Sequence, residues 1–371
     1  MESRVRLGQI WGIPIGLHTS WFIIFLLLTF SLAVGYFPQE YEDLSPAVAW
    51  LLGGVTSVLF FGSVLAHELA HAWVALRNEI PVRSITLFIF GGVAQIEREP
   101  HTPGAEFRIA IAGPIMSLAL AGGFFALYQI DQPVATLAAP SIYLARINFL
   151  LGLFNMIPGF PLDGGRVLRA IVWKLTGNMR RATRIAGSVG QVVAFGFMSW
   201  GALTLLTGSL FNGLWIMFIG WFLQNAAMNV VAQSDIQEAL RGVSVGQIMS
   251  RECLLIPREQ PLRELVESRV LREGERCFMV GDGEHMDGML TLRDVAAVPQ
   301  TRWDELTAGE VMVPWSKLTR VSPRTELLDA LRAMDRQNVA QLPVVDGDQL
   351  VGVLTREQVL RYVHMRSQLG V

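Results

Sequence analysis

The sequence predicts a polytopic α-helical membrane protein, with six transmembrane helices and a membrane-associated β-hairpin, followed by a soluble α+β module. Three observations predict this class. Six apolar stretches are long enough to span a bilayer, the composition becomes that of a soluble protein near residue 232, and two similar segments follow at a constant interval. The domains expected along the 371 residues are 1–231, a linker at 232–242, repeats at 243–298 and 306–371, and a linker at 299–305.

Composition excludes several classes of function. A formal net charge of -2 gives no reason to expect a nucleic-acid partner. The two cysteines, Cys253 and Cys277, both lie in the soluble part, which favours neither a disulfide framework nor a thiolate metal site. No signal-peptide cleavage pattern follows the first apolar stretch, so we expect that stretch to be a retained anchor.

The charges in the loops predict the orientation of the spans. A span needs about 20 apolar residues, and six such stretches lie near 17–37, 47–76, 108–128, 138–157, 185–207 and 211–231. The loops near 38–46, 129–137 and 208–210 contain no Lys or Arg, whereas the opposite segments contain many. By the excess of basic residues in cytosolic loops, both termini are expected in the cytosol.

One apolar stretch, residues 84–96, is too short to span. Its β-branched and aromatic residues around Gly91 and Gly92 favour a β-hairpin that enters the membrane from the cytosolic side. Open strand edges are tolerated at that depth only against protein or a water-filled cavity, so this hairpin should line one. An ordinary amphipathic cytosolic loop is the alternative.

Three ionisable residues, His67, Glu68 and His71, lie within the second apolar stretch. A charge at the centre of a membrane helix costs roughly 2.5–3.5 kcal/mol, so such groups indicate function. Positions i and i+4 share a helix face, so both histidines can bind one ion, and Glu68 lies about 100° round from His67. Zinc would need a third protein ligand and an open position. H-E-x-x-H alone is a short pattern that also occurs by chance.

The third ligand should come from an element that reaches the same depth. His67 lies about 30 Å along its helix, at the cytosolic end, and the fourth span runs in the same direction. That span ends in FNMIPGFPLDGGRV, where Pro158 and Pro161 break the helix and Asp163 follows. A proline-glycine turn with a solvated aspartate at a helix start is the alternative.

Together, AHELAH at 66–71 and the N-x-x-P-x-x-P-L-D-G-G pattern from Asn155 to Gly165 resemble the site-2 protease family of intramembrane zinc metalloproteases. GIPIGLHTSW near the start, FGGVAQI, and AGP at 112–114 agree with this resemblance, which covers residues 1 to about 230. The resemblance implies one Zn²⁺ per chain, with His67, His71 and Asp163 as ligands and Glu68 as general base.

The same resemblance implies how substrates bind. Asn155 would hydrogen-bond the substrate backbone or the developing oxyanion, although it can equally bond a neighbouring helix. The hairpin with Gly91 and Gly92 would add a strand to an extended substrate segment. Substrates would be single-span regulatory membrane proteins such as anti-sigma or pro-sigma factors, cleaved near the cytosolic face of a prokaryotic plasma membrane.

The soluble half contains a duplication. Asp282 and Asp346, Gly288 and Gly352, and Thr291 and Thr355 are each 64 residues apart, which indicates two copies of one unit. Each copy should form a short strand, a helix (262–272; 325–337), a hairpin of two apolar strands and a second helix.

This half resembles a tandem pair of CBS (cystathionine-β-synthase) domains, which bind ATP, ADP, AMP or related ligands in clefts between repeats and can form homodimers. In the element GMLTLRD, Thr291 would contact phosphate and Asp294 ribose. The second copy has Thr355, but Gln358 replaces the aspartate, so at most one complete adenosine site is implied. The stretch 232–242 would transmit a change of state between the two parts.

The sequence assigns no role at the metal site to three further polar residues, and it leaves two alternative functions to be weighed. Arg146 lies within the fourth span without a partner that the sequence identifies, and neither His18 nor His101 is expected to bind metal. A CBS-regulated ion transporter or channel is the main alternative function, but the six spans show no internal repeat of the kind common in transporters. A metal-free relative is disfavoured by the intact ligand set.

Overall fold

The computed structural model describes residues 5–41, 44–89, 91–96, 99–132, 134–251, 254–282, 285–347 and 349–369. Cys253 lies outside these residues. The chain divides into two compact units, Met1–Ser234 and Asp235–Val371, each considered below by itself.

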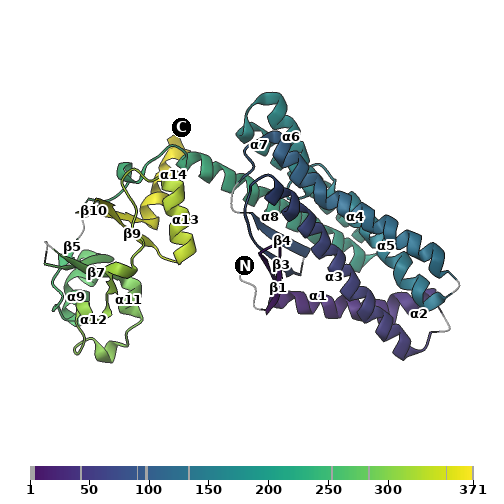
Figure 1. The fold of residues 1–371 in the computed structure, drawn as a ribbon, viewed down its shortest axis with the longest axis horizontal. Coiled ribbons are helices and arrows are strands. Elements are labelled where there is room, and N and C mark those ends of the chain that lie inside the picture. Colours follow the sequence, from purple (N-terminus) through teal and green to yellow (C-terminus); the bar gives the residue numbers. More distant parts are fainter. Residues whose placement is uncertain are drawn as a thin grey trace. The chain divides into compact units, whose positions relative to one another are not determined.

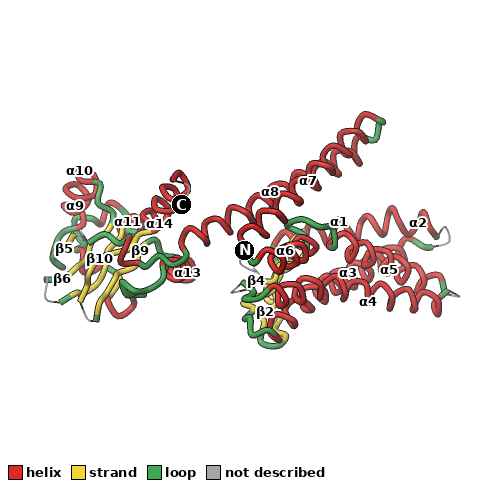
Figure 2. The backbone as a smooth tube through the Cα atoms, turned by 90° about the horizontal axis from the view of Figure 1, so that it is seen from above, coloured by secondary structure: helices red, strands yellow, loops and turns green. Residues whose placement is uncertain are grey.

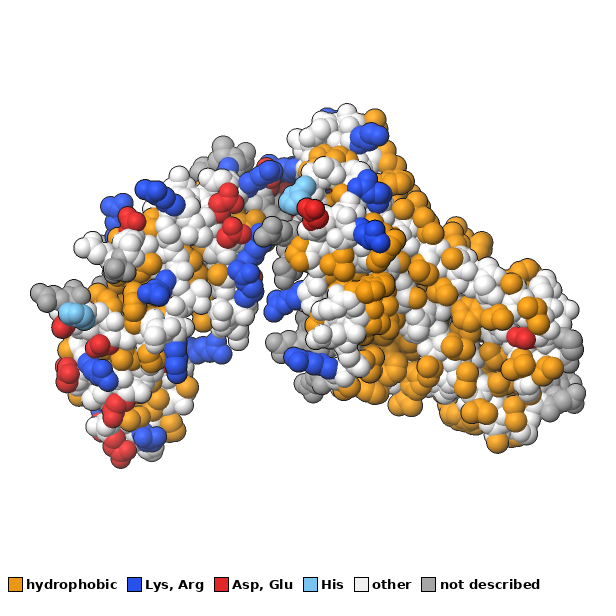
Figure 3. All heavy atoms as spheres, in the orientation of Figure 1, with side chains coloured by type: hydrophobic (Ala, Val, Ile, Leu, Met, Phe, Trp, Pro, Cys, Tyr) orange, Lys and Arg blue, Asp and Glu red, His pale blue; other side chains and the backbone are white. Residues whose placement is uncertain are grey.

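The first unit contains six helices long and apolar enough to cross a membrane, as the sequence predicts. The first comprises α1 (Thr19–Phe30), the π-helical turn η1 (Ser31–Tyr36) and α2 (Phe37–Glu40). The other five are α3 (Pro46–Arg77), α4 (Pro103–Asp131), α5 (Ala135–Asn155), α7 (Met179–Leu206) and α8 (Leu210–Leu240) (Figure 1). On the face drawn in Figure 3, apolar side chains cover these helices, as expected of surfaces that meet lipid.

Helix α4 is central to the bundle, since it packs against α3, α5 and the shorter helix α6 (Asp163–Thr176). Its first turn is well defined by sequence. The Thr102 hydroxyl accepts a hydrogen bond from the Ala105 amide at 3.2 Å, and Pro103 occupies a position where no backbone N–H is needed. A shift of α4 would therefore displace the three helices that pack against it, α3, α5 and α6.

A four-stranded sheet lies against the second half of α3, with strand order β1-β2-β3-β4. Strands β3 (Val82–Phe88) and β4 (Gly91–Ile96) form the predicted hairpin, so the alternative of an ordinary loop is wrong. Ile85 of β3 is fully buried in a core with Ala72 and Ala75 of α3. Because β4 is an edge of this sheet among the described strands, one of its backbone edges remains unpaired there.

The other two strands were not predicted. Strands β1 (Val5–Ile10) and β2 (Ile13–Leu17) pair antiparallel around a two-residue turn, Trp11 and Gly12, where both residues have positive φ, as a type I′ turn requires. Strand β2 then runs parallel to β3, with Ile15 opposite Ile85. This pairing joins residues 70 positions apart in the chain, so no local sequence pattern predicts it.

The second unit consists of the two predicted repeats (Figure 2). The first contains β5 (Leu254–Ile256), a helical segment of α9, η3 and α10 (Leu262–Glu273), β6 (Cys277–Gly281), β7 (Met286–Thr291) and α11 (Leu292–Ala296). The second contains α13 (Leu327–Gln337), β9 (Gln341–Asp346), β10 (Gln349–Thr355) and α14 (Arg356–Leu369). The second repeat begins with α12 (Ala308–Val311) and the short strand β8 (Val313–Pro314), and β8 pairs with β7 of the first repeat.

The stretch 232–242 is mostly helical, since α8 continues to Leu240. Leu240 is fully buried in the hydrophobic core of the second repeat, together with Leu327 and Val344. The end of α8 is thus an integral part of the second unit rather than a loop attached to it.

Candidate metal centre

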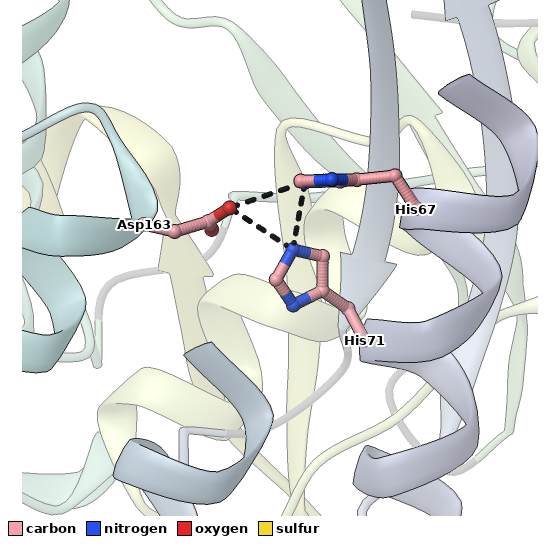
Figure 4. Close-up of side chains that lie close together, drawn as sticks. All are labelled: His67, His71 and Asp163. Carbon is pink, nitrogen blue, oxygen red and sulfur yellow. Dashed lines mark hydrogen bonds and ion pairs between the residues drawn. The ribbon is translucent and has the colours of Figure 1, made fainter. Parts of the chain in front are cut away.

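Three side chains of the first unit converge on one point (Figure 4). His67 and His71 project from adjacent turns of α3, and Asp163 is the first residue of α6. The Asp163 Oδ2 atom lies 3.2 Å from His67 Nε2 and 3.1 Å from His71 Nε2, and the two Nε2 atoms are 3.2 Å apart. Both histidines are buried, and these three residues form a group able to hold a metal ion.

The opposite ring nitrogens are held by α4. His71 Nδ1 donates to the carbonyl oxygen of Ile109 at 2.6 Å, and His67 Nδ1 lies 2.8 Å from the Ser117 hydroxyl. Bonds of this kind fix the imidazole tautomer and orientation, so that the lone pair of Nε2 points to the metal. The sequence did not identify Ser117, although its spacing of eight from Ile109 places both on one face of α4.

The space around the convergence point depends on Gly113 of α4. A Cβ atom at this position would lie 2.2 Å from His71 Nε2 and 2.5 Å from His67 Nε2. The AGP segment at 112–114 contains this glycine, so the resemblance contained the signal, but the reason for it is visible only in the structure.

The donor set fits zinc. Ligands at about 2.0–2.2 Å from a tetrahedral zinc ion are about 3.3 Å from one another, close to the separations observed here. Two imidazoles and one carboxylate also leave the fourth position open, as in catalytic zinc sites.

Glycines place Asp163 by allowing backbone to pack on backbone. A Cβ at Gly164 would lie 2.4 Å from the carbonyl oxygens of Met156 and Ile157, and one at Gly165 would lie 2.3 Å from the carbonyl carbon of Gly159. The loop after α5 therefore lies directly on the first turn of α6. This contact explains why two glycines follow the aspartate.

Glu68 lies beside the candidate metal ligands and against strand β4 of the sheet. A Cβ at Gly92 of β4 would lie 2.4 Å from the Glu68 Cγ atom, so only glycine fits there. The Glu68 Oε1 atom would lie 3.2 Å from the same Cβ, so the carboxylate also faces β4. The edge strand and the carboxylate are thus in direct contact.

The other polar residues and the glycine singled out from the sequence lie in different elements of the first unit. Asn155 ends α5 and donates its side-chain amide to the Leu151 carbonyl at 3.0 Å, and Gly91 begins β4 with a φ of 126°. His18 caps α1: its Nδ1 atom accepts a hydrogen bond from the Ser20 amide, so this ring nitrogen already has a partner. His101 is exposed in a loop, and Arg146 lies near the Tyr36 hydroxyl.

The second unit contains a cavity of about 1060 Å³ between its repeats. Thr291, Asp294 and Thr355 line it, with Gln358 and basic residues that include Arg276 and Arg356. Thr291 and Asp294 bond each other in a capping box at the start of α11: the Thr291 hydroxyl donates to Asp294 at 2.6 Å. In the second copy, the Gln358 side chain accepts from the Thr355 amide at 2.8 Å.

Family models match both halves of the chain, in agreement with the two resemblances stated from the sequence. The model of peptidase family M50 matches residues 55–134 and 122–197, and that of the CBS domain matches residues 245–300 and 308–365. The chain is 35% identical over 365 residues to the "Putative zinc metalloprotease sll0528" of Synechocystis, covering 97% of this chain and 96% of that protein. The chain belongs to peptidase family M50. It is a site-2 protease family zinc metalloprotease with a C-terminal CBS domain pair.

A second curated relative matches nearly the whole chain, and a solved structure matches part of it. The "Putative zinc metalloprotease Rip3" of Mycobacterium tuberculosis is 35% identical over 370 residues, which is 98% of this chain and 93% of that protein. A solved site-2 protease from Methanocaldococcus jannaschii is 30% identical, with a TM-score of 0.44, and the match covers 61% of this chain and 94% of that one. Membership of this family decides against the ion transporter or channel.

Proposed function

We propose that this M50 protein is an intramembrane endopeptidase that cleaves membrane-spanning segments of single-span regulatory proteins, such as anti-sigma or pro-sigma factors, near the cytosolic face. One observation carries the proposal: the two imidazoles and the Asp163 carboxylate converge beside Glu68, and the edge of β4 lies against that same glutamate. A metal site, a base and a site for extended backbone thus occur together within the apolar unit.

The residues that would hold the zinc ion are His67, His71 and Asp163, with Ile109 and Ser117 orienting the imidazoles. Zinc bound there would polarise the scissile carbonyl and acidify an attacking water. Glu68, adjacent to the ligands, takes the proton from that water and delivers it to the leaving amine. The close approach of Gly92 in β4 holds the Glu68 side chain in place for both transfers.

Substrate binding follows from the edge of β4. An extended segment that pairs with Gly91 and Gly92 is placed next to Glu68, because Gly92 packs on that side chain. Asn155 uses one amide hydrogen for the Leu151 carbonyl, and the second is available for the substrate backbone or the oxyanion.

Orientation and regulation belong to the same proposal. The distribution of Lys and Arg supports cytosolic termini, and on the face drawn in Figure 3 the basic side chains of the first unit lie at the end that holds the sheet and α6. An adenine nucleotide would bind in the cavity of the CBS pair, where Thr291, Asp294 and Thr355 are present together with basic side chains.

The decisive experiment replaces the base without disturbing the metal ligands. Glu68→Gln keeps the shape of the side chain but removes the proton acceptor, so cleavage of a reporter membrane segment by purified protein should cease while bound zinc remains. Zinc content is measured on the same sample. Continued cleavage at the wild-type rate, or a wild-type protein without zinc, would disprove the proposed mechanism.

A further inference from the structure

A buried ion pair connects α4 to α6, outside the metal ligands. The Arg169 side chain of α6 donates from Nε to the Glu106 Oε1 atom of α4 at 2.8 Å, and its terminal nitrogen bonds the same oxygen. Glu106 is fully buried and Arg169 is 7% exposed. The guanidinium also lies over the Phe160 ring, 5.3 Å from its centroid, in the loop that leads to Asp163.

This cluster is poorly explained as a source of stability. Replacing a buried ion pair with apolar residues of similar size is often neutral or stabilising. Here the second oxygen of Glu106, Oε2, is buried without a hydrogen-bond partner among the described residues. Arg166 approaches only to 3.8 Å, and it reaches Oε1 rather than Oε2. A cluster with an unsatisfied oxygen calls for another role.

Helix α4 provides a common reference for all three metal ligands. Glu106, Ile109, Gly113 and Ser117 lie on one stripe of α4, within an arc of about 80°. Ile109 and Ser117 hold the two imidazoles, and Gly113 leaves room at the point where their Nε2 atoms meet. Glu106, one turn before Ile109, holds α6 through Arg169. Each ligand is thus fixed, directly or through one residue, to the same helix.

Helix α6 needs such a fixed reference. It is a 14-residue helix that is not one of the long spans, and Asp163 is its first residue. Apolar packing has no strong directional preference and permits small sliding or rotation, whereas a hydrogen-bonded ion pair fixes register. A metal ligand displaced by a fraction of an ångström no longer matches zinc geometry.

We infer that Glu106 is a positioning residue: through Arg169 it fixes α6 on α4 so that the Asp163 carboxylate meets both imidazoles at ligand distance. The inference deepens the proposed function and rests on it, because it assumes that the three residues bind zinc. Glu106 itself touches neither the metal nor the substrate. Its loss should therefore weaken zinc binding and leave the chemical groups of the site in place.

The test compares zinc affinity in the purified full-length protein, by competition with a chelator of known affinity. Glu106→Gln should weaken zinc binding by about 10–100-fold, the range usual for residues that orient metal ligands. Because all ligands remain, excess zinc should restore the turnover rate. A purely structural role would instead lower the unfolding temperature and would not respond to zinc. Asp304→Asn, which removes an exposed Arg263–carboxylate pair in the other unit, is the matched control.

A second variant keeps the inference testable where Glu106→Gln fails to fold. The double change Glu106→Gln with Arg169→Met removes the pair without leaving an uncompensated buried charge, and it should show the same weakening of zinc binding. Wild-type zinc affinity in the variants that fold would overturn the inference while leaving the protease proposal intact. A wild-type protein that neither binds zinc nor cleaves would overturn both.

Discussion

The metal centre and the cavity of the CBS pair satisfy their polar side chains differently. At the metal centre, His67 and His71 bond outward, to Ser117 and to the Ile109 carbonyl, and their other nitrogens meet at a shared point. In the cavity, Thr291 and Asp294 bond each other. Two of the basic residues there have acidic partners: Arg356 pairs with Asp335 at 2.7 Å and Arg276 with Glu357 at 3.6 Å.

The difference separates a site that requires a ligand from one that tolerates its absence. Two imidazole nitrogens and a carboxylate packed within 3.2 Å gain most from a cation placed among them. In the cavity, Thr291, Asp294 and Arg356 already have side-chain partners, so the nucleotide proposed to bind there would exchange existing bonds for new ones, with less net gain. Such an exchange would suit the reversible regulatory ligand proposed for this cavity.

The largest effect is expected from a change at the place where the two Nε2 atoms and the Asp163 carboxylate meet. Gly113→Ala places a methyl group 2.2–2.5 Å from both Nε2 atoms, so the imidazoles have to move apart. We expect zinc binding and cleavage to fall by at least about 100-fold, beyond the usual range for residues outside the ligand set. Metal analysis and a reporter cleavage assay measure this.

The matched control for that change is Gly122→Ala, in the same helix. Nothing lies within 4 Å of a Cβ at Gly122, so this variant should retain zinc and activity. Equal losses in both variants would show that α4 does not tolerate alanine in general, and the role assigned to Gly113 would be wrong.

A smaller effect is expected at Ser117. Ser117→Ala removes the bond to His67 Nδ1 but leaves all ligands, so zinc affinity should fall about 10-fold and excess zinc should restore cleavage. Ser141→Ala provides the comparison, because Ser141 is also a mostly buried serine but bonds Asp131 and the Leu137 carbonyl. Unchanged affinity in Ser117→Ala would mean that His67 needs no outside partner.

The smallest effect concerns the cavity. Thr291→Val removes the capping box of α11 and should cost about 0.5–2 kcal/mol in the stability of the CBS unit, with no nucleotide present. Thermal unfolding followed with and without AMP measures this, and a Thr291 contact to phosphate would also reduce the stabilisation by AMP. Loss of stabilisation by AMP without any change in the nucleotide-free protein would show that the side chain serves only the ligand.

The sequence predicted the elements whose signals are local. Span length and hydropathy are properties of single segments, so all six long helices were expected near their observed positions. The i, i+4 spacing of His67 and His71 fixes their common face within one helix. The repeat at 64 residues likewise required only the comparison of two segments.

Features built from distant segments were not predicted. The β1–β2 hairpin joins the sheet through parallel pairing with β3, and α6 was expected only as a break after the fourth span. Glu106 and Ser117 carry no motif of their own, and the AGP segment marks Gly113 without showing its role, because these roles depend on which helix faces α4. The depth of the fourth span made Asp163 a candidate, and the resemblance to a known family implied its role as a metal ligand.

Under the proposed pairing of substrates with β4, the contact between Gly92 and Glu68 has a consequence for substrate choice. A segment that pairs with β4 must first exchange its own i to i−4 hydrogen bonds for bonds to a neighbouring strand. In lipid, where water cannot solvate a melted turn, that exchange is costly until the strand is reached. Proteins whose membrane helices contain glycine or proline at the right depth therefore melt more readily and should be cut in preference to uniformly helical ones.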